Sequence, residues 1–241
     1  MPCPANYLQY MAFVLKLRLV NRMVHSVNYL KICQPFSKDV TLGSTTMSFL
    51  YDQYGKRKYL TIAERTAFLE AARQAGDDTF TFCAMLAYTG ARISEVLALI
   101  PGRFDLDDQV IVIQCLKKRR PGTNRVVPVP ALLLREIDQI HMIRRKQQTA
   151  NANEKLIWPW CRTTAWKRVK DVMKMAGLSG PHASPKGLRH SFGVCALQSH
   201  APINMVQKWL GHARITTTAI YADAVGEEER QLAENFWRTF V

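Results

Sequence analysis

The chain has 241 residues, 48% of them hydrophobic and 22% charged, which is enough apolar material for one large domain or one domain with a small appendage. Its 33 Lys and Arg residues against 19 Asp and Glu residues give a net charge of +14. Such an excess favours a polyanionic partner, with nucleic acid as the first expectation and a merely solvated basic surface as the plainer alternative. No stretch reaches the roughly 18 uncharged apolar residues of a membrane span, and the N-terminus lacks the order of a signal peptide. We therefore expect a cytoplasmic protein.

The cysteines and histidines are not spaced for metal binding. The six cysteines are scattered singly with no CxxC pair, and the six histidines form no HExxH motif. In a chain of this length, single cysteines indicate buried thiols in a reducing compartment, not a disulfide framework or a zinc site. We expect neither a metal nor a cofactor.

The character of the sequence changes near residue 58. Residues 1–57 are basic and show one or two short helical patterns, with too little apolar material for an obvious core of their own. Thr61 and Glu64 then form a capping box that starts a helix. We expect a short basic helical N-terminal segment at 1–57 and a larger domain at 58–241.

The larger domain is predicted to be mainly α with a small antiparallel β-sheet (α+β). Two apolar β-branched runs, VIVIQ (110–114) and VVPV (126–129), flank a basic turn and predict a hairpin. In the helix expected at 163–176, Trp166 shares a face with Val169 and Met173, and Gly177 ends the helix. The remaining helical patterns lie at 78–88 (ending at Gly90), 94–99, 131–148, 187–199, 203–211, 216–223 and 227–240.

Three segments combine side chains that are typical of phosphate chemistry. TGARISEVLAL (89–99) places Arg92 at the start of a helix, and KGLRHSFG (186–193) places Lys186, Arg189 and His190 within about one helical turn. In LGHARITTTAIYADA (210–224), a histidine precedes Tyr221 by nine residues.

This set of residue types is suited to transferring a DNA strand onto a tyrosine. Two guanidinium groups can grip one phosphate bidentately and stabilise the charge of a five-coordinate phosphorus. A tyrosine with a free pKa of roughly 10 is a poor nucleophile, but a neighbouring cationic cluster favours its phenolate form. A lysine can protonate the departing sugar oxygen.

These segments, in this order, resemble the tyrosine recombinase (phage integrase) family. The family pattern has a TGxRxSEhhxL box, a hairpin lysine, an HxLRH box, an LGH box and a tyrosine shortly after, and the resemblance covers residues about 58–241. Each box alone is weak evidence, whereas four boxes in order are specific. The resemblance implies a tyrosine-recombinase catalytic domain that acts on double-stranded DNA without a cofactor. It also implies a homo-oligomer, dimer to tetramer on DNA, that can exchange C-terminal segments.

The resemblance also implies residue roles. Arg92 and Arg189 would clamp the scissile phosphate, His212 would bind the phosphate or its developing charge, and Tyr221 would form a 3′-phosphotyrosine link while releasing a 5′-hydroxyl. The hairpin lysine is assigned to Lys117, which follows the strand directly, with Lys118 as the alternative. The side chains expected to contact DNA are Lys118, Arg119, Arg120, Arg125 and His190.

The sequence departs from the family pattern in two places. Lys186 stands where the family usually has histidine; an ammonium can donate a hydrogen bond to phosphate but is no base unless its pKa is strongly depressed. His182 is the other candidate, but we expect Pro185 to interrupt the helix between it and Arg189. Residues 1–57 are also shorter than the usual core-binding domain, so a helper protein that holds the DNA site is one possibility.

Three functions remain open at this point. The leading one is a site-specific recombinase, associated with the bacterial nucleoid and serving integration, excision or resolution. The second is a type IB topoisomerase-like enzyme that religates the same strand. The third is a degenerate, non-cleaving DNA-binding homologue. The plainer alternatives are that Arg92 only pairs with Glu95, that Tyr221 is an ordinary surface tyrosine, and that Phe236, Trp237 and Phe240 pack locally.

Overall fold

The computed structural model describes residues 50–116, 123–149, 155–222, 234, 237 and 238. The chain divides into residues 1–45 and 46–241, and every described residue belongs to the second part. The expectations for residues 1–49 and for most of 227–240 therefore lie outside the described residues. The same is true of Lys117, Lys118, Arg119 and Arg120 in the hairpin turn.

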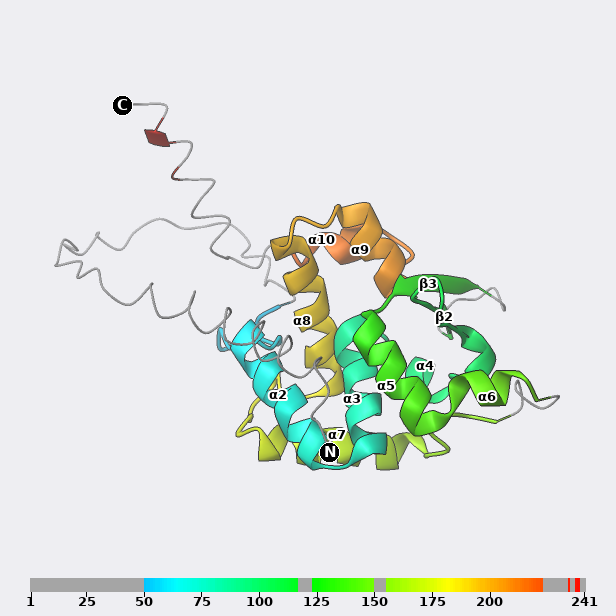
Figure 1. Cartoon of the computed structure of the whole chain (residues 1–241). Helices are drawn as coiled ribbons and strands as arrows, with labels where there is room; N and C mark the ends of the chain where they lie inside the picture. Colours follow the sequence, from blue (N-terminus) through cyan, green and yellow to red (C-terminus); the bar gives the residue numbers. More distant parts are fainter. Residues whose placement is uncertain (1–49, 117–122, 150–154, 223–233, 235–236, 239–241) are drawn as a thin grey trace. The chain divides into compact units, whose positions relative to one another are not determined.

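The fold is mainly helical, as predicted, and its helices surround α3 (Figure 1). α3 contacts α2, α4, α5, α7 and α8, and nearly all of its side chains are buried. The helices are α2 (Ile62–Gln74), α3 (Asp77–Thr89), α4 (Ile93–Leu97), α5 (Ala131–His141), α6 (Ile143–Gln147), α7 (Arg162–Met175), α8 (Pro185–Gln198), α9 (Ile203–Leu210) and α10 (Thr216–Ala219). None of them combines the length and hydropathy that crossing a membrane requires.

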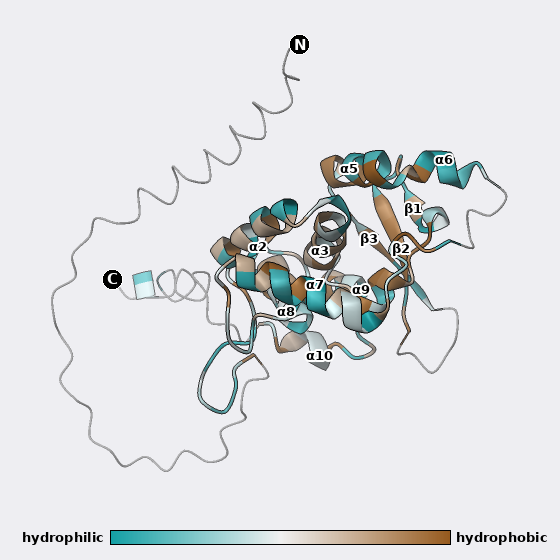
Figure 2. Cartoon of the chain, turned by 90° about the horizontal axis from the view of Figure 1, so that it is seen from below, coloured by the Kyte–Doolittle hydropathy of each residue, from teal (hydrophilic) through white to brown (hydrophobic). Residues whose placement is uncertain are grey.

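A small antiparallel sheet lies beside the helices. It has the strand order β1 (Phe104–Asp105), β2 (Val110–Gln114), β3 (Asn124–Pro128), and Val112 pairs with Val126 in the predicted hairpin. Figure 2 shows the sheet as largely hydrophobic and α6 as largely hydrophilic. The hairpin prediction is confirmed. β1 was missed because two residues are too few to show an alternating pattern.

The helix ends follow local signals. Thr61 accepts a hydrogen bond from the Glu64 amide, and Glu64 accepts one from Thr61 in return, so the predicted capping box is present. Gly90 ends α3 with φ +60°, where a Cβ would lie 2.7 Å from the Phe192 ring. Both signals were readable from the sequence.

The single helix predicted at 131–148 was wrong. Met142 adopts a left-handed conformation with φ +54° and splits the segment into α5 and α6. The Met142 amide donates to the Asp138 carbonyl, and the Asp138 carboxylate accepts from the Arg144 amide. Asp138 thus accepts hydrogen bonds at the end of α5 and at the start of α6. A helical pattern of apolar residues does not reveal this break.

The predicted face of α7 also needs a correction. Ala165, Val169, Val172 and Met173 form its buried stripe, whereas Trp166 is 47% exposed. Trp166 lies about 100° around the helix from Ala165 and is thereby turned out of the core.

A second, smaller apolar cluster lies beside the main core. It contains Leu50, Val194, Val206, Leu210 and Tyr221, all nearly inaccessible to solvent. Leu50 precedes the boundary expected at residue 58, yet it packs with residues of α8 and α9. This cluster holds the ring of the tyrosine that the sequence singled out.

Candidate functional site

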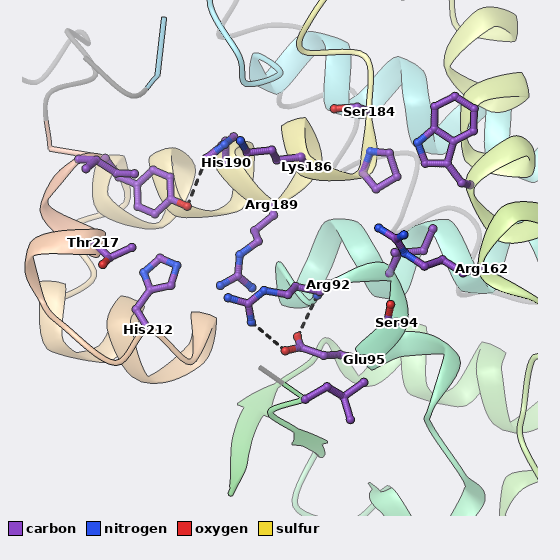
Figure 3. A pocket seen from close by; sticks show the side chains of 16 residues that line it. Arg92, Ser94, Glu95, Arg162, Ser184, Lys186, Arg189, His190, His212 and Thr217 are labelled. Atoms are coloured by element: carbon purple, nitrogen blue, oxygen red, sulfur yellow. Dashed lines mark hydrogen bonds and ion pairs between the residues drawn. The ribbon is translucent and has the colours of Figure 1, made fainter. Parts of the chain in front are cut away.

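A pocket of about 510 Å³ is lined by all the predicted site residues of the described part of the chain except Arg125 (Figure 3). It lies between α4, α7, α8 and the segment that follows α9. The predicted residues that line it are Arg92, Lys186, Arg189, His190, His212 and Tyr221. Leu116, the last described residue before Lys117, lines it too.

Arg92 is positioned by the turn between two helices. Gly90 ends α3, and Arg92 is the N-cap residue of α4. Its backbone amide donates to Glu95 Oε2 at 2.9 Å, and its Nη1 donates to Glu95 Oε1 at 2.8 Å. The pairing with Glu95 is therefore present, yet Arg92 still points into the pocket (Figure 3).

The prediction that Arg125 contacts DNA needs a correction, because its side chain is buried inside the protein. Its side chain is 3% exposed and donates from Nη2 to Glu95 Oε2 at 2.7 Å. Its Nε donates to the Trp209 carbonyl at 2.7 Å, and its Nη1 lies 3.3 Å from Cys115 Sγ. Arg125 thus joins the hairpin, α4 and the end of α9 from inside the protein.

Glu95 is the buried counter-charge for two arginines. Burial alone would raise the pKa of this carboxyl, but the hydrogen bonds and charges of Arg125 and Arg92 outweigh burial and lower it below its ordinary value. Glu95 is therefore ionised at neutral pH. It fixes Arg92 on one side and Arg125 on the other.

Arg189 is buried and lines the pocket. Its Nη1 donates to the Gly90 carbonyl and its Nη2 to the Leu210 carbonyl, both at 2.7 Å. Burial, followed by the charge of Arg92, lowers its pKa to about 10, so the guanidinium remains charged at neutral pH. Two fixed cations therefore face the same space (Figure 3).

Tyr221 is buried to 3% exposure, so it is not an ordinary surface tyrosine. Its hydroxyl lies 3.3 Å from His190 Nδ1. Its ring packs on α8 at Gly193, where a Cβ would come within 2.6 Å of the ring. In the DNA-free protein, burial disfavours its phenolate, whereas the neighbouring cations favour it, as expected. Burial raises the pKa of Tyr221 and outweighs the lowering by Arg189 and Arg92.

His212 lies over the face of the tyrosine ring. The two rings are stacked with an interplanar angle of 17° and centroids 6.1 Å apart. His212 Nδ1 is 2.9 Å from the Thr218 hydroxyl. Burial, followed by Arg189 and Arg92, lowers the pKa of His212 to about 4, so its ring is neutral at pH 7.

The structure distinguishes between Lys186 and His182 as candidates for the usual histidine position. Pro185 is the first residue of α8 and Ser184 caps it, so the proline starts this helix instead of interrupting one. Lys186, in the first turn, is exposed and lines the pocket. His182 lies before the helix with its Nε2 3.5 Å from Glu64 Oε1. Lys186 is therefore the candidate that lies at the site.

Sequence reasoning missed several residues at or behind the pocket. Trp166 and Arg162, one turn apart on α7, both line it. Trp166 was predicted to share the apolar face of the helix because it lies three positions before Val169. The contact of Arg125 with Glu95 joins residues thirty positions apart, and no local spacing signals it.

The arrangement is suited to anionic phosphodiester chemistry. Two arginines, a neutral histidine and a tyrosine line one pocket. Among the described residues, no group of three or more His, Cys, Asp or Glu side chains is placed to hold a metal ion.

Comparisons with known proteins find relatives of this chain. Residues 58–228 match the phage integrase family. The tyrosine recombinase XerD of Mycobacterium tuberculosis is 34% identical over 182 residues, which cover 68% of this chain and 56% of that protein. XerD of Chlamydia muridarum is 31% identical over 155 residues, covering 61% and 48%. The chain spans about half the length of these relatives.

Solved structures show the same fold. The crystal structure of XerA recombinase superposes with a TM-score of 0.62 at 25% identity, covering 74% of this chain and 64% of that one. The XerH site-specific recombinase, in a pre-cleavage complex with its difH substrate, superposes with a TM-score of 0.59 at 21% identity, covering 78% and 59%.

Proposed function

Because this chain belongs to the phage integrase family, we propose that it is a site-specific DNA recombinase that cuts and rejoins strands through Tyr221. One observation carries the proposal: Tyr221 lines the same pocket as Arg92 and Arg189, and the charges of both arginines act on its hydroxyl. The XerD relatives are named tyrosine recombinases, and the XerH structure holds its DNA substrate. For this chain, the substrate class is double-stranded DNA.

The geometry supports one order of events. A backbone phosphate enters the pocket and is held by the free donors of Arg92 and Arg189, with Lys186 and His212 as further donors. The Tyr221 oxygen attacks phosphorus, the bond to the 5′ oxygen breaks, and a 3′-phosphotyrosine forms. Attack by a 5′-hydroxyl of a second strand then reverses these bonds and completes the exchange, so no external energy source is needed.

The roles of the hairpin and the termini are part of the same proposal. Lys117, or Lys118 behind it, protonates the leaving 5′ oxygen, and Lys118, Arg119 and Arg120 bind the DNA backbone. A homo-oligomer on DNA, from dimer to tetramer, brings two duplexes together, with exchange of C-terminal segments between copies. Mobile-element integration is one role consistent with this chemistry.

Covalent capture tests the proposal without a known target. The purified chain is incubated with a pool of nicked random-sequence duplexes, because loss of the short strand next to a nick traps the covalent intermediate. Protein-linked DNA is recovered under denaturing conditions, amplified and sequenced. We expect a defined sequence to emerge and adduct to vanish in Tyr221→Phe, which lacks the attacking oxygen.

The control is DNA binding of the Tyr221→Phe variant, which keeps the ring and its packing and is expected to bind the recovered duplex as the natural chain does. Absence of adduct from the natural chain, together with sequence-specific binding, would contradict the proposal and indicate a non-cleaving DNA-binding homologue. Relaxation of supercoiled DNA by a monomer, without strand exchange, would indicate the topoisomerase-like activity.

A further inference from the structure

His190, which we expected to contact DNA, is buried beside the Tyr221 hydroxyl. The residue is 8% exposed, and its Nδ1 lies 3.3 Å from the Tyr221 hydroxyl. Its Nε2 is inaccessible to solvent and has no hydrogen-bond partner among the described residues. Buried polar atoms are nearly always paired, so an unpaired one beside a reactive group calls for a functional explanation.

The other side chains around Tyr221 are poorly suited to remove its proton. Arg92 and Arg189 have no acceptor atom, and Lys186 is an ammonium ion in its ordinary state. The His212 ring is stacked on the face of the tyrosine ring, and its Nδ1 is hydrogen-bonded to Thr218. Among the described residues, His190 is the one with an acceptor nitrogen in hydrogen-bond range of the phenol oxygen.

Resting on the recombinase function proposed above, we propose that His190 is the general base that takes the phenolic proton of Tyr221 during strand cleavage. As the Tyr221 oxygen forms its bond to phosphorus, its proton moves to His190 Nδ1, and the electron pair of the breaking bond leaves with the 5′ oxygen. That oxygen is protonated by the hairpin lysine. During rejoining, the imidazolium returns its proton to Tyr221.

The surroundings of His190 make this base depend on DNA. Burial, followed by the charges of Lys186, Arg189 and Lys58, lowers the pKa of His190 to about 4, so the free ring is neutral and has a lone pair. The same cations oppose formation of an imidazolium. A phosphate between Arg92 and Arg189 supplies the negative charge that offsets them and raises the proton affinity of the ring. Tyr221 therefore stays protonated until DNA is bound.

The departure at Lys186 fits this assignment. The resemblance places a histidine at that position, and the exposed Lys186 is at hand as a phosphate donor but not as a base. In this chain, the role of proton acceptor falls to the next histidine along α8.

Two substitutions at one position separate proton transfer from positioning. In His190→Asn, an amide atom lies near the place of Nδ1 and keeps a hydrogen bond to Tyr221, but it cannot accept the proton. In His190→Gln, the amide lies near the place of Nε2 and the bond to Tyr221 is lost. His200→Asn is the matched control, since His200 is exposed outside the pocket with φ +60°, a conformation that asparagine tolerates.

The experiment measures single-turnover cleavage of the nicked duplex that covalent capture recovers, from pH 5 to pH 9. We expect His190→Asn and His190→Gln each to cleave about 100-fold or more slowly than the natural chain, and His200→Asn to cleave normally. The natural rate should level off above the pKa of the DNA-bound imidazole. The His190→Asn rate should rise about tenfold per pH unit, because only pre-formed phenolate reacts.

Two outcomes would overturn the assignment. One is cleavage by His190→Asn at nearly the natural rate with the natural pH profile, which would make His190 a positioning residue. The other is a natural rate that keeps rising tenfold per pH unit to pH 9, a result that needs no variant to fold. Failure of the natural chain to form any adduct is a different result, since it removes the proposed function itself.

Discussion

Glu95 is fully buried and accepts hydrogen bonds from Arg92 and Arg125. A single carboxylate therefore fixes the position of the pocket arginine relative to the hairpin. Glu95→Gln keeps the shape but leaves Arg125, 3% exposed, without a counter-charge. Removing one partner of a buried ion pair is costly. We expect the free energy of unfolding to fall by about 3 kcal/mol, measured by urea denaturation. A change under 1 kcal/mol would show that hydrogen bonding alone suffices here.

The same carboxyl predicts a pH dependence of stability. Because the pKa of Glu95 is lower in the folded chain than its ordinary value of 4.5, the folded state binds its proton less readily than the unfolded state does. Its stabilising contribution is present above pH 4.5 and is lost as the pH falls through the lowered pKa. Denaturation midpoints between pH 6 and pH 3 should fall less steeply for Glu95→Gln than for the natural chain; parallel curves would contradict this.

Single residues were predictable where their signal is local. The capping box and the pairing of Arg92 with Glu95 each join residues three positions apart, and the short sequence boxes themselves single out Arg189 and Tyr221. The role of Arg125 was not predictable, because its contacts come from α4 and α9 and a basic run looks the same whether it faces solvent or a buried carboxylate. The packing of the Tyr221 ring on Gly193 was equally unpredictable, since a glycine in a helix does not indicate which ring will pack on it.

At the scale of an element, the ring of Tyr221 packs against α8. A Cβ at Gly193 would lie 2.6 Å from the Tyr221 ring, although alanine is the better helix former by about 1 kcal/mol. We expect Gly193→Ala to slow adduct formation at least tenfold while the fold persists. In a Tyr221→Ala background, where the ring is gone, the same change should raise stability.

This double-mutant comparison uses thermal unfolding of the four proteins. A positive effect of Gly193→Ala without the ring and a negative effect with it would show the steric coupling. Equal effects in both backgrounds would mean that the ring does not rest on α8 in solution.

Elements were predictable where periodicity and end signals agree. α2, α7, α8 and α9 have apolar stripes and recognisable ends, α3 is apolar on nearly all sides, and the hairpin has β-branched strands around a turn. α5 and α6 appeared as one helix because the break at Met142 is made by Asp138 and carries neither glycine nor proline. β1 consists of two residues and exists only because β2 pairs with it.

At the scale of the whole molecule, the proposed function predicts that DNA binding is linked to proton uptake through charge. In the free protein, burial and nearby cations lower the pKa of both His190 and His212 to about 4. A bound phosphate raises both pKa values by supplying negative charge. The DNA complex therefore binds more protons than the free protein at mildly acidic pH. By linkage, affinity for the selected duplex must rise as the pH falls from 8 towards 5.5.

Tyr221→Phe is the protein for this measurement, because it binds without cleaving. Calorimetry in two buffers that differ in ionisation enthalpy reports the protons taken up, at a fixed salt concentration because phosphate contacts make affinity steeply salt-dependent. Adding His190→Asn or His212→Asn should each reduce the uptake, and adding both should nearly abolish it. Uptake that survives both changes would place the linked protons on other groups of this basic chain and leave the two pocket histidines neutral beside the bound phosphate.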